Sequence, residues 1–280
     1  TGKSGAYRVN SMLTGVSGAA YLVGPYVSGL LTDKCGPASA ILASSLCCLA
    51  SWILTVATAV VWSDVEVPVP THSPLATSIS EGLRYCRTSP AIRRLFLLGL
   101  VTGFSTISVN LAFYPFAFDD LHVTARGWGL MISVYYGANV IAMLIVRYLR
   151  NIHERDGTML IYVCLIAVSA TYMLYSVGRS YFGVLLLQLA EGIAISLAGI
   201  FTAAAFQINT QKSFMARVSG INDIFSNVGK IGGIIISGLF TEKLNFSAVF
   251  VLNAVLLFIF AAAHIIGMLF TRPGNKVSRY

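Results

Sequence analysis

The side chains of this chain that could do chemistry lie inside long apolar stretches. Gln188 and Glu191 lie three residues apart in one stretch, and a second stretch carries Asp223, Asn227 and Lys230. A buried carboxylate in an apolar solvent is costly and usually faces a cavity or a partner. Such a group can bind and release protons. We therefore expect Glu191 to serve in proton or substrate binding or, equally, in a structural hydrogen bond between helices.

The second stretch predicts a polar stripe along one helix, because its polar residues recur at spacings of three and four. These residues are Ser219, Asn222, Asp223, Ser226, Asn227 and Lys230. Lys230 needs an anion, and Glu191 is the nearest candidate in depth, so we hypothesise a Glu191–Lys230 pair. The alternatives are an anionic substrate at Lys230, or a lysine that extends toward the membrane interface. Gly229, Gly232 and Gly233 would allow close helix approach or bending.

Two further candidates lie in other stretches. Asn110 precedes Pro115, which we expect to kink or end its helix. Asn110 would line a cavity or form an interhelical hydrogen bond. Tyr136 could stack on an aromatic solute or simply pack, and packing is the favoured interpretation.

The elements that position these residues are apolar segments long enough to cross a bilayer. The chain is 56% hydrophobic and 11% charged, against about 25% charged in soluble domains. Backbone amides in lipid must be satisfied within their own segment, so the segments predict helices. We place them at about 9–32, 37–62, 91–117, 127–149, 158–177, 181–207, 214–240 and 246–270. The predicted fold class is an all-α membrane protein.

The formal charge of +8 does not indicate nucleic-acid binding, because the basic residues form no continuous patch. Most of them fall in alternate breaks between segments. By the positive-inside rule, this places both ends of the chain on the cytoplasmic side of the cytoplasmic (inner) membrane. No metal-ligand spacing, cofactor motif or nucleophile–base pattern is present, so we expect no metal, no cofactor, no catalytic residue and no enzyme.

The largest break runs from Ser63 to about Pro90 and is rich in proline and serine. Residues 81–87 within it predict a short amphipathic helix. Two helices precede this break and six follow it.

Three segments carry a resemblance to the major facilitator superfamily, and within it to the bacterial enterobactin exporter and drug efflux group. Residues 15–29 resemble the exporter motif of the fifth helix of that family, including Gly24, Pro25 and Gly29, although Ala20 and Ser28 stand where glycine is usual. Residues 81–94 resemble the start of the seventh helix, and residues 216–233 the start of the eleventh.

The resemblance implies the last eight helices of a twelve-helix bundle. Residues 1–62 would be the last two helices of the N-terminal bundle, 63–90 a cytoplasmic loop, 91–271 the C-terminal bundle, and 272–280 a cytoplasmic tail. It also implies a monomeric carrier that exports a small organic solute, siderophore-like or drug-like, by proton antiport. The partners would be that solute, protons and lipid. Open alternatives are a sugar or macrolide efflux carrier of the same fold, a polytopic membrane enzyme, or an incomplete, non-transporting fragment.

Overall fold

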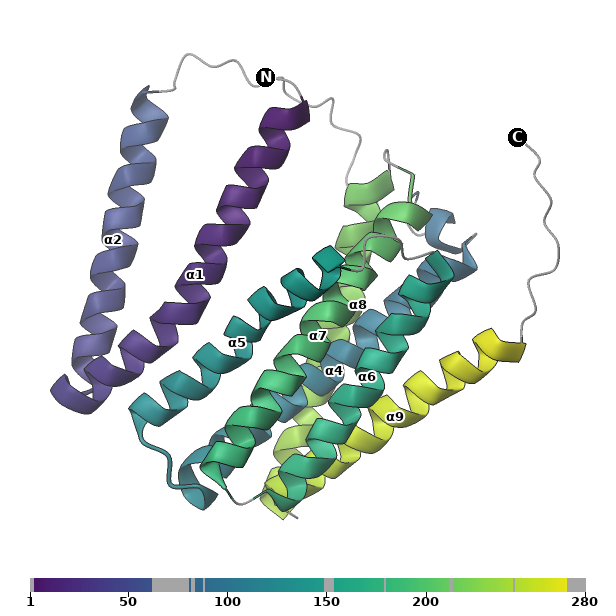
Figure 1. The fold of residues 1–280 in the computed structure, drawn as a ribbon. Coiled ribbons are helices and arrows are strands. Elements are labelled where there is room, and N and C mark those ends of the chain that lie inside the picture. The colour runs from purple at the N-terminus through teal and green to yellow at the C-terminus, as the bar shows by residue number, and fades with distance from the viewer. Residues whose placement is uncertain are drawn as a thin grey trace. The chain divides into compact units, whose positions relative to one another are not determined.

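A computed structural model describes residues 3–61, 81, 84–87, 89–148, 154–178, 180–211, 214–243 and 245–270. Eight long helices occupy most of these ranges (Figure 1). They are α1 (Lys3–Cys35), α2 (Pro37–Val61), α4 (Pro90–Pro115), α5 (Ala125–Tyr148), α6 (Glu154–Val177), α7 (Tyr181–Asn209), α8 (Met215–Lys243) and α9 (Phe246–Phe270). The all-α fold class and the eight helices expected from the apolar segments are confirmed.

The helix ends follow local signals in the sequence. Gly36 adopts a positive φ of 81° between α1 and α2, a conformation that glycine adopts without steric cost. Ser89 caps α4, because its Oγ accepts a hydrogen bond from the amide of Ile92 at 3.4 Å. At the other end of α4, Pro115 ends the α-helix and a π-helical turn, η1 (Phe116–Asp120), continues the chain. The predicted break at Pro115 is therefore present.

Seven of the eight helices are long and apolar enough to cross a membrane. This search covered the described part of the chain and found spans within α2 and α4 through α9, the α4 span including η1. The chain is thus a multi-pass membrane protein. The first helix, α1, forms over its full predicted length but is not in this set, so its crossing of the membrane stays a prediction.

The chain divides into two compact units, which we describe separately. The first contains residues 1–79 and 123–133, so α1 and α2 share it with the first turns of α5. Helices α1 and α2 form a hairpin in this unit (Figure 1). The second unit contains residues 80–122 and 134–280. The predicted loop at 63–90 lies largely outside the described residues, as does the predicted tail at 272–280, and the bundle boundaries stay a prediction.

Two parallel helices, α4 and α8, pack backbone to backbone in the second unit. A Cβ added at Gly229 would meet the carbonyl group of Leu100, and one added at Gly233 would meet the carbonyl oxygen of Phe104. Small residues allow membrane helices to approach this closely. The sequence prediction that these glycines permit close helix approach is confirmed, and the contact fixes which face of α8 is turned toward α4.

A buried polar centre joins α4, α8 and α9 further along the same helices. The Ser237 hydroxyl donates to the backbone oxygen of Ser108 at 3.0 Å, and the Asn253 amide donates to the Ser108 hydroxyl at 3.0 Å. All three side chains are buried. Because such bonds have no competing water in a bilayer interior, they specify how the three helices pack.

Candidate functional site

Helix α8 presents three different faces. Its glycine face packs against α4, as described above. A second face is apolar and exposed, with Ile231 as one of its members. The third face carries Asp223, Asn227 and Lys230, which all have exposed side chains within a helix of membrane-spanning length. We call this set the α8 polar row.

The α8 polar row follows helical spacing of four and three residues, so its members lie on one side of the helix. Lys230 Nζ donates a hydrogen bond to Asn227 Oδ1 at 3.2 Å. A charged side chain at the centre of a bilayer costs about 2.5–3.5 kcal/mol on insertion scales. This face is therefore suited to contact water, solute or protein, and unsuited to contact lipid tails.

Glu191 occupies a different environment on α7. Its side chain is buried, at 6% exposure. The Tyr175 hydroxyl donates to Glu191 Oε2 at 2.8 Å. The buried ring of Tyr172 stacks on that of Tyr175, with ring centroids 6.4 Å apart. Gly192 allows the close approach that encloses the site, because a Cβ there would meet the carbonyl oxygen of Tyr135 on α5. We call Glu191, Tyr172 and Tyr175 the carboxyl–tyrosine cluster.

The hypothesised Glu191–Lys230 pair is not formed in the structure. Glu191 accepts a hydrogen bond from Tyr175 of α6, whereas Lys230 donates to Asn227 on its own helix. The depth argument placed both residues near the middle of the membrane, but it could not give the rotation of each helix. Rotation turns Glu191 inward and Lys230 outward, so the pair is corrected to two separate sites.

The remaining candidates divide between buried and exposed positions. Gln188 is buried one turn before Glu191, and its Oε1 has no hydrogen-bond partner within the described residues. Asn110 is exposed, and its amide donates to the Thr106 backbone oxygen of the same helix at 2.8 Å. Tyr136 is exposed and packs edge-to-face on Tyr135, with ring centroids 5.3 Å apart. Their functional roles stay predictions.

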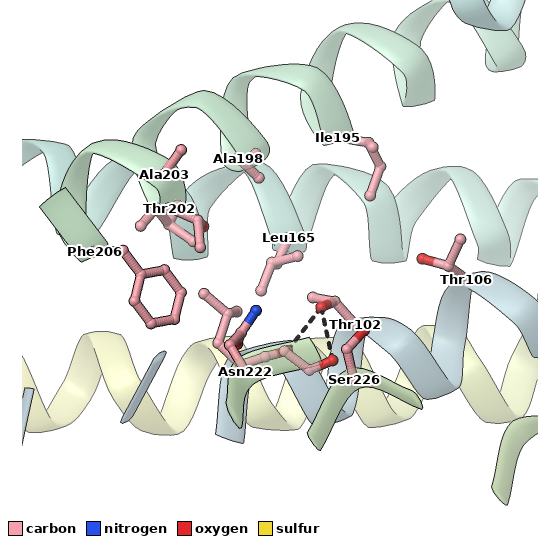
Figure 2. A pocket seen from close by; sticks show the side chains of 14 residues that line it. Thr102, Thr106, Leu165, Ile195, Ala198, Thr202, Ala203, Phe206, Asn222 and Ser226 are labelled. Atoms are coloured by element: carbon pink, nitrogen blue, oxygen red, sulfur yellow. Dashed lines mark hydrogen bonds between the residues drawn. The ribbon is translucent and has the colours of Figure 1, made fainter. Parts of the chain in front are cut away.

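A cavity of about 390 Å³ lies within the second unit. This volume is in the range of small-molecule sites, about 300–1,000 Å³. Its lining comes from α4, α6, α7 and α8. The polar side chains around it are Thr102, Thr106, Thr202, Asn222 and Ser226 (Figure 2). Two residues of the predicted polar stripe, Asn222 and Ser226, thus face this cavity, whereas the α8 polar row does not line it.

The sequence interpretation missed several of these residues. Tyr172 and Tyr175 follow helical spacing in an apolar segment, and this is the signal that could have predicted a polar partner on α6. Thr102 and Thr202 gave no signal, since isolated threonines are common in membrane helices.

The segment resembling an exporter motif lies in the first unit. A Cβ at Gly29 would meet the backbone of Ala125, and one at Gly129 would meet the carbonyl oxygen of Pro25. A Cβ at Gly24 would meet nothing within 4 Å in the described residues. The contact of α1 with the start of α5 therefore depends on Gly29 and Gly129.

Polar bonds reinforce that contact. Asp33 Oδ2 accepts a hydrogen bond from the backbone amide of Arg126 at 3.0 Å. The Arg126 guanidinium donates to the Tyr26 hydroxyl at 3.1 Å and lies over the Tyr26 ring. Together with the glycine contacts, these bonds join α1 to the start of α5 inside the first unit.

A docked segment precedes α4 in the second unit. The described residues of the predicted short helix, 81 and 84–87, are helical. Glu81 forms an ion pair with Arg217 at 2.7 Å, and the Tyr85 ring stacks on Phe214 with centroids 4.5 Å apart. Cys86 is buried in the same contact, at 4% exposure. The segment thus attaches to the start of α8.

Comparison with known proteins agrees with this arrangement. A profile described as the Major Facilitator Superfamily matches residues 95–279. The chain belongs to the major facilitator superfamily. The match spans α4 through α9, which hold the cavity, the carboxyl–tyrosine cluster and the α8 polar row. No curated protein matches the chain significantly.

Membership gives the chain its general class. Proteins of this superfamily are membrane transporters and not enzymes, which supports a transporter for this chain. The resemblance to the enterobactin exporter and drug efflux group within it stays a prediction.

Proposed function

We propose that this chain is a secondary active transporter that exports a small organic solute across the cytoplasmic membrane by alternating access and proton antiport. Siderophore-like and drug-like solutes are the leading substrates in this proposal. Both chain ends lie in the cytoplasm, and the protein acts as a monomer with a solute, protons and lipid as its partners.

The observation that carries the proposal is the α8 polar row. Asp223, Asn227 and Lys230 are exposed on a helix that otherwise meets the criteria of a membrane span. Because lipid tails cannot solvate these groups, their face fits a water-filled passage through the membrane. Substrate sites of secondary transporters lie near the bilayer midplane, which is where this row falls along α8.

The carboxyl–tyrosine cluster supplies the proton-binding part of the proposal. Glu191 is enclosed by α5, α6 and α7, and its carboxyl accepts a hydrogen bond from the neutral hydroxyl of Tyr175. Among the described residues no cation pairs with Glu191, so its ionised form is costly in this enclosed site, and its proton should leave only as the surrounding helices rearrange. Alternating access would expose it to each side of the membrane in turn.

Inverted membrane vesicles provide the test, because export from the cell becomes uptake into the vesicle. Vesicles carrying the full chain would be made acidic inside and supplied with a labelled catecholate siderophore, a macrolide or a disaccharide. We expect uptake of at least one probe, abolished by a protonophore and accompanied by a rise of internal pH. Uptake no greater than in vesicles lacking the protein, for all three probes, would contradict export.

The same assay separates the alternatives. Uptake of the disaccharide or the macrolide alone would select the other efflux carriers of this fold. Uptake that survives the protonophore would remove proton antiport while leaving transport in place. Probe binding by the purified chain without net uptake in any direction would indicate a non-transporting fragment.

A further inference from the structure

The cavity of the second unit differs from the α8 polar row in that, among the residues that the structure describes, no ionisable side chain lines it. Its lining residues are Leu98, Gly99, Thr102, Thr106, Ile161, Leu165, Ile195, Ala198, Gly199, Thr202, Ala203, Phe206, Asn222 and Ser226. Nine of the fourteen are glycine or apolar, and the other five are hydroxyl or amide residues.

The hydroxyl groups around the cavity retain capacity for hydrogen bonds. The Thr102 hydroxyl donates within its own helix, to the Leu98 oxygen at 2.8 Å, which leaves its oxygen free only to accept. The side chains of Thr106, Thr202 and Ser226 form no hydrogen bond within the described residues. Each of these three hydroxyls can donate one hydrogen bond and accept others.

Asn222 is the most polar group of the cavity. A Cβ at Gly99 would lie 2.7 Å from Asn222 Oδ1, so glycine at this position makes room for the amide. That oxygen is buried and has no hydrogen-bond partner within the described residues. The amide nitrogen points into the cavity (Figure 2). An unpaired buried amide is costly, and a bound group with both donors and acceptors would relieve that cost.

We propose that this cavity is a subsite for an uncharged group of the transported solute that bears hydroxyl or amide functions, as in a neutral sugar or a neutral amide. Asn222, Thr106, Thr202 and Ser226 would bind its polar atoms, and Leu165, Ile195 and Phe206 would contact its carbon atoms. The inference rests on the proposed transport function and adds a substrate class to it.

Such a cavity disfavours the binding of charged groups. Moving an ionised group out of water into a site without a counter-charge costs far more than moving a neutral polar group that finds hydrogen bonds there. Asp223 and Lys230 are the ionisable residues next to Asn222 and Ser226 along α8, but they lie in the exposed row and not in the cavity lining. A catecholate or carboxylate group would therefore meet the row, and a neutral group would enter the cavity.

Cysteine labelling tests this inference without knowledge of the natural substrate. Thr202→Cys and Ser226→Cys would be made separately in a full chain whose own five cysteines are replaced. Three methanethiosulfonate reagents would be compared: a neutral hydroxyethyl, an anionic sulfonatoethyl and a cationic trimethylammonium reagent. Asn227→Cys is the matched control, because it lies on the same helix but in the exposed row.

For each cysteine we take the ratio of the labelling rate of the neutral reagent to that of each charged reagent. We expect this ratio to be at least about tenfold higher at the two cavity cysteines than at position 227. Equal ratios at the cavity and control positions would overturn the inference. Failure of all three reagents to label the cavity cysteines, in a variant that keeps its thermal unfolding temperature, would also overturn it.

An isosteric charge change gives an independent measurement. Asn222→Asp in the Thr202→Cys background would place a carboxylate in the cavity, and we expect the cationic-to-anionic rate ratio there to rise at least about tenfold. Asn139→Asp, at an exposed position of α5, is the matched control and should leave the ratio unchanged. A ratio unaffected by Asn222→Asp would show that residues 202 and 222 do not share a cavity.

These labelling rates do not require transport. If no probe enters inverted vesicles but the cavity still selects neutral reagents, the proposed function fails while the subsite remains. If a solute is exported but charged reagents label the cavity freely, the subsite fails while the proposed function remains.

Discussion

The carboxyl–tyrosine cluster of α7 and the polar row of α8 are both polar interruptions of apolar helices, yet they lie in opposite environments. Glu191 is 6% exposed and accepts a hydrogen bond from the Tyr175 hydroxyl. Asp223 and Lys230 are exposed, and within the described part of the chain Lys230 bonds to Asn227 of its own helix. The two regions therefore cannot do the same work.

The difference indicates a division between proton and solute. A buried carboxyl beside tyrosine side chains is protected from lipid and from direct contact with a bulky solute. A proton does not need the space that such a solute needs to reach the carboxyl. An exposed row with both signs of charge can meet a solute directly but is poorly isolated from water. We therefore propose that α7 binds the proton and α8 contacts the solute, and the following predictions test this proposal.

The largest expected effect is on proton coupling at Glu191. Glu191→Gln keeps the shape and the hydrogen-bonding capacity of the side chain but removes its ionisation. We expect uptake driven by the pH gradient into inverted vesicles to fall by about a hundredfold, near the upper range of coupling between sites. Exchange of labelled for unlabelled solute without a gradient should persist, because solute contact is assigned to α8.

Asp223→Asn is the matched carboxyl control for that experiment. It should retain gradient-driven uptake at saturating solute. If Asp223→Asn abolished that uptake and Glu191→Gln did not, the two assignments would be reversed.

A smaller, opposite pattern is expected for Lys230→Met, which removes the positive charge of the row and retains the side-chain length. For an anionic solute, we expect the KM of uptake to rise about tenfold, because the solute loses one charge-assisted hydrogen bond. The maximal rate at saturating solute should change little. A fall in maximal rate with an unchanged KM would instead place Lys230 in the conformational step.

The packing of α8 on α4 determines which α8 residues are exposed, and a steric change tests it. Gly229→Ala should lower the free energy of unfolding in detergent by about 1–3 kcal/mol, because the new methyl group would meet the backbone of Leu100. Gly238→Ala on the same helix is the control, since a Cβ there meets nothing within 4 Å. Equal thermal stability of the two variants would mean that the α8 polar row is assigned to the wrong face.

The hydrogen bond between Tyr175 and Glu191 should make a measurable contribution to the free energy of unfolding. Tyr175→Phe should cost about 1–3 kcal/mol of unfolding free energy, the range for leaving a buried partner unsatisfied. In the Glu191→Leu background, the same substitution should cost less, because the carboxyl is already gone. Additive costs in this double-mutant cycle would show that the two side chains do not interact.

The smallest effect concerns the segment that attaches to the start of α8, and Cys86 reports on it. Burial raises the pKa of the Cys86 thiol, and the thiolate is the reactive form. In a chain that keeps only this cysteine, alkylation should be slow near neutral pH and accelerate as the pH rises toward that raised pKa.

Arg217→Gln breaks the ion pair with Glu81 and should expose Cys86. We expect alkylation to become about twofold to fivefold faster, because a partly exposed ion pair contributes a free energy that corresponds to a factor of this size. The pH profile of alkylation should move to lower pH. Arg93→Gln, at an exposed position of α4, is the control. An unchanged rate in Arg217→Gln would remove the ion pair from the contact.

The two regions were not equally predictable. The sequence predicted one polar stripe of six residues on α8, because these residues recur at helical spacing. The structure divides that stripe: Asn222 and Ser226 line the cavity, whereas Asp223, Asn227 and Lys230 form the exposed row. Glu191 was predicted as a buried carboxyl, but its partner was assigned wrongly. Hydropathy gives the depth of a residue in the membrane but carries no information on helix rotation. The rotation of the helices determines that Tyr175, and not Lys230, is the partner of Glu191.

The amino-acid sequence by itself determined the helices of this protein, because a backbone in lipid must bond within its own segment and each apolar run therefore folds locally. It also determined where the helices end, through residues such as Gly36 and Pro115. Only the tertiary structure decided which polar groups share a site. Tyr175 and Glu191, Asn222 and Thr202, and Glu81 and Arg217 come together through packing between segments, and no local pattern specifies the rotation and contact on which such pairs depend.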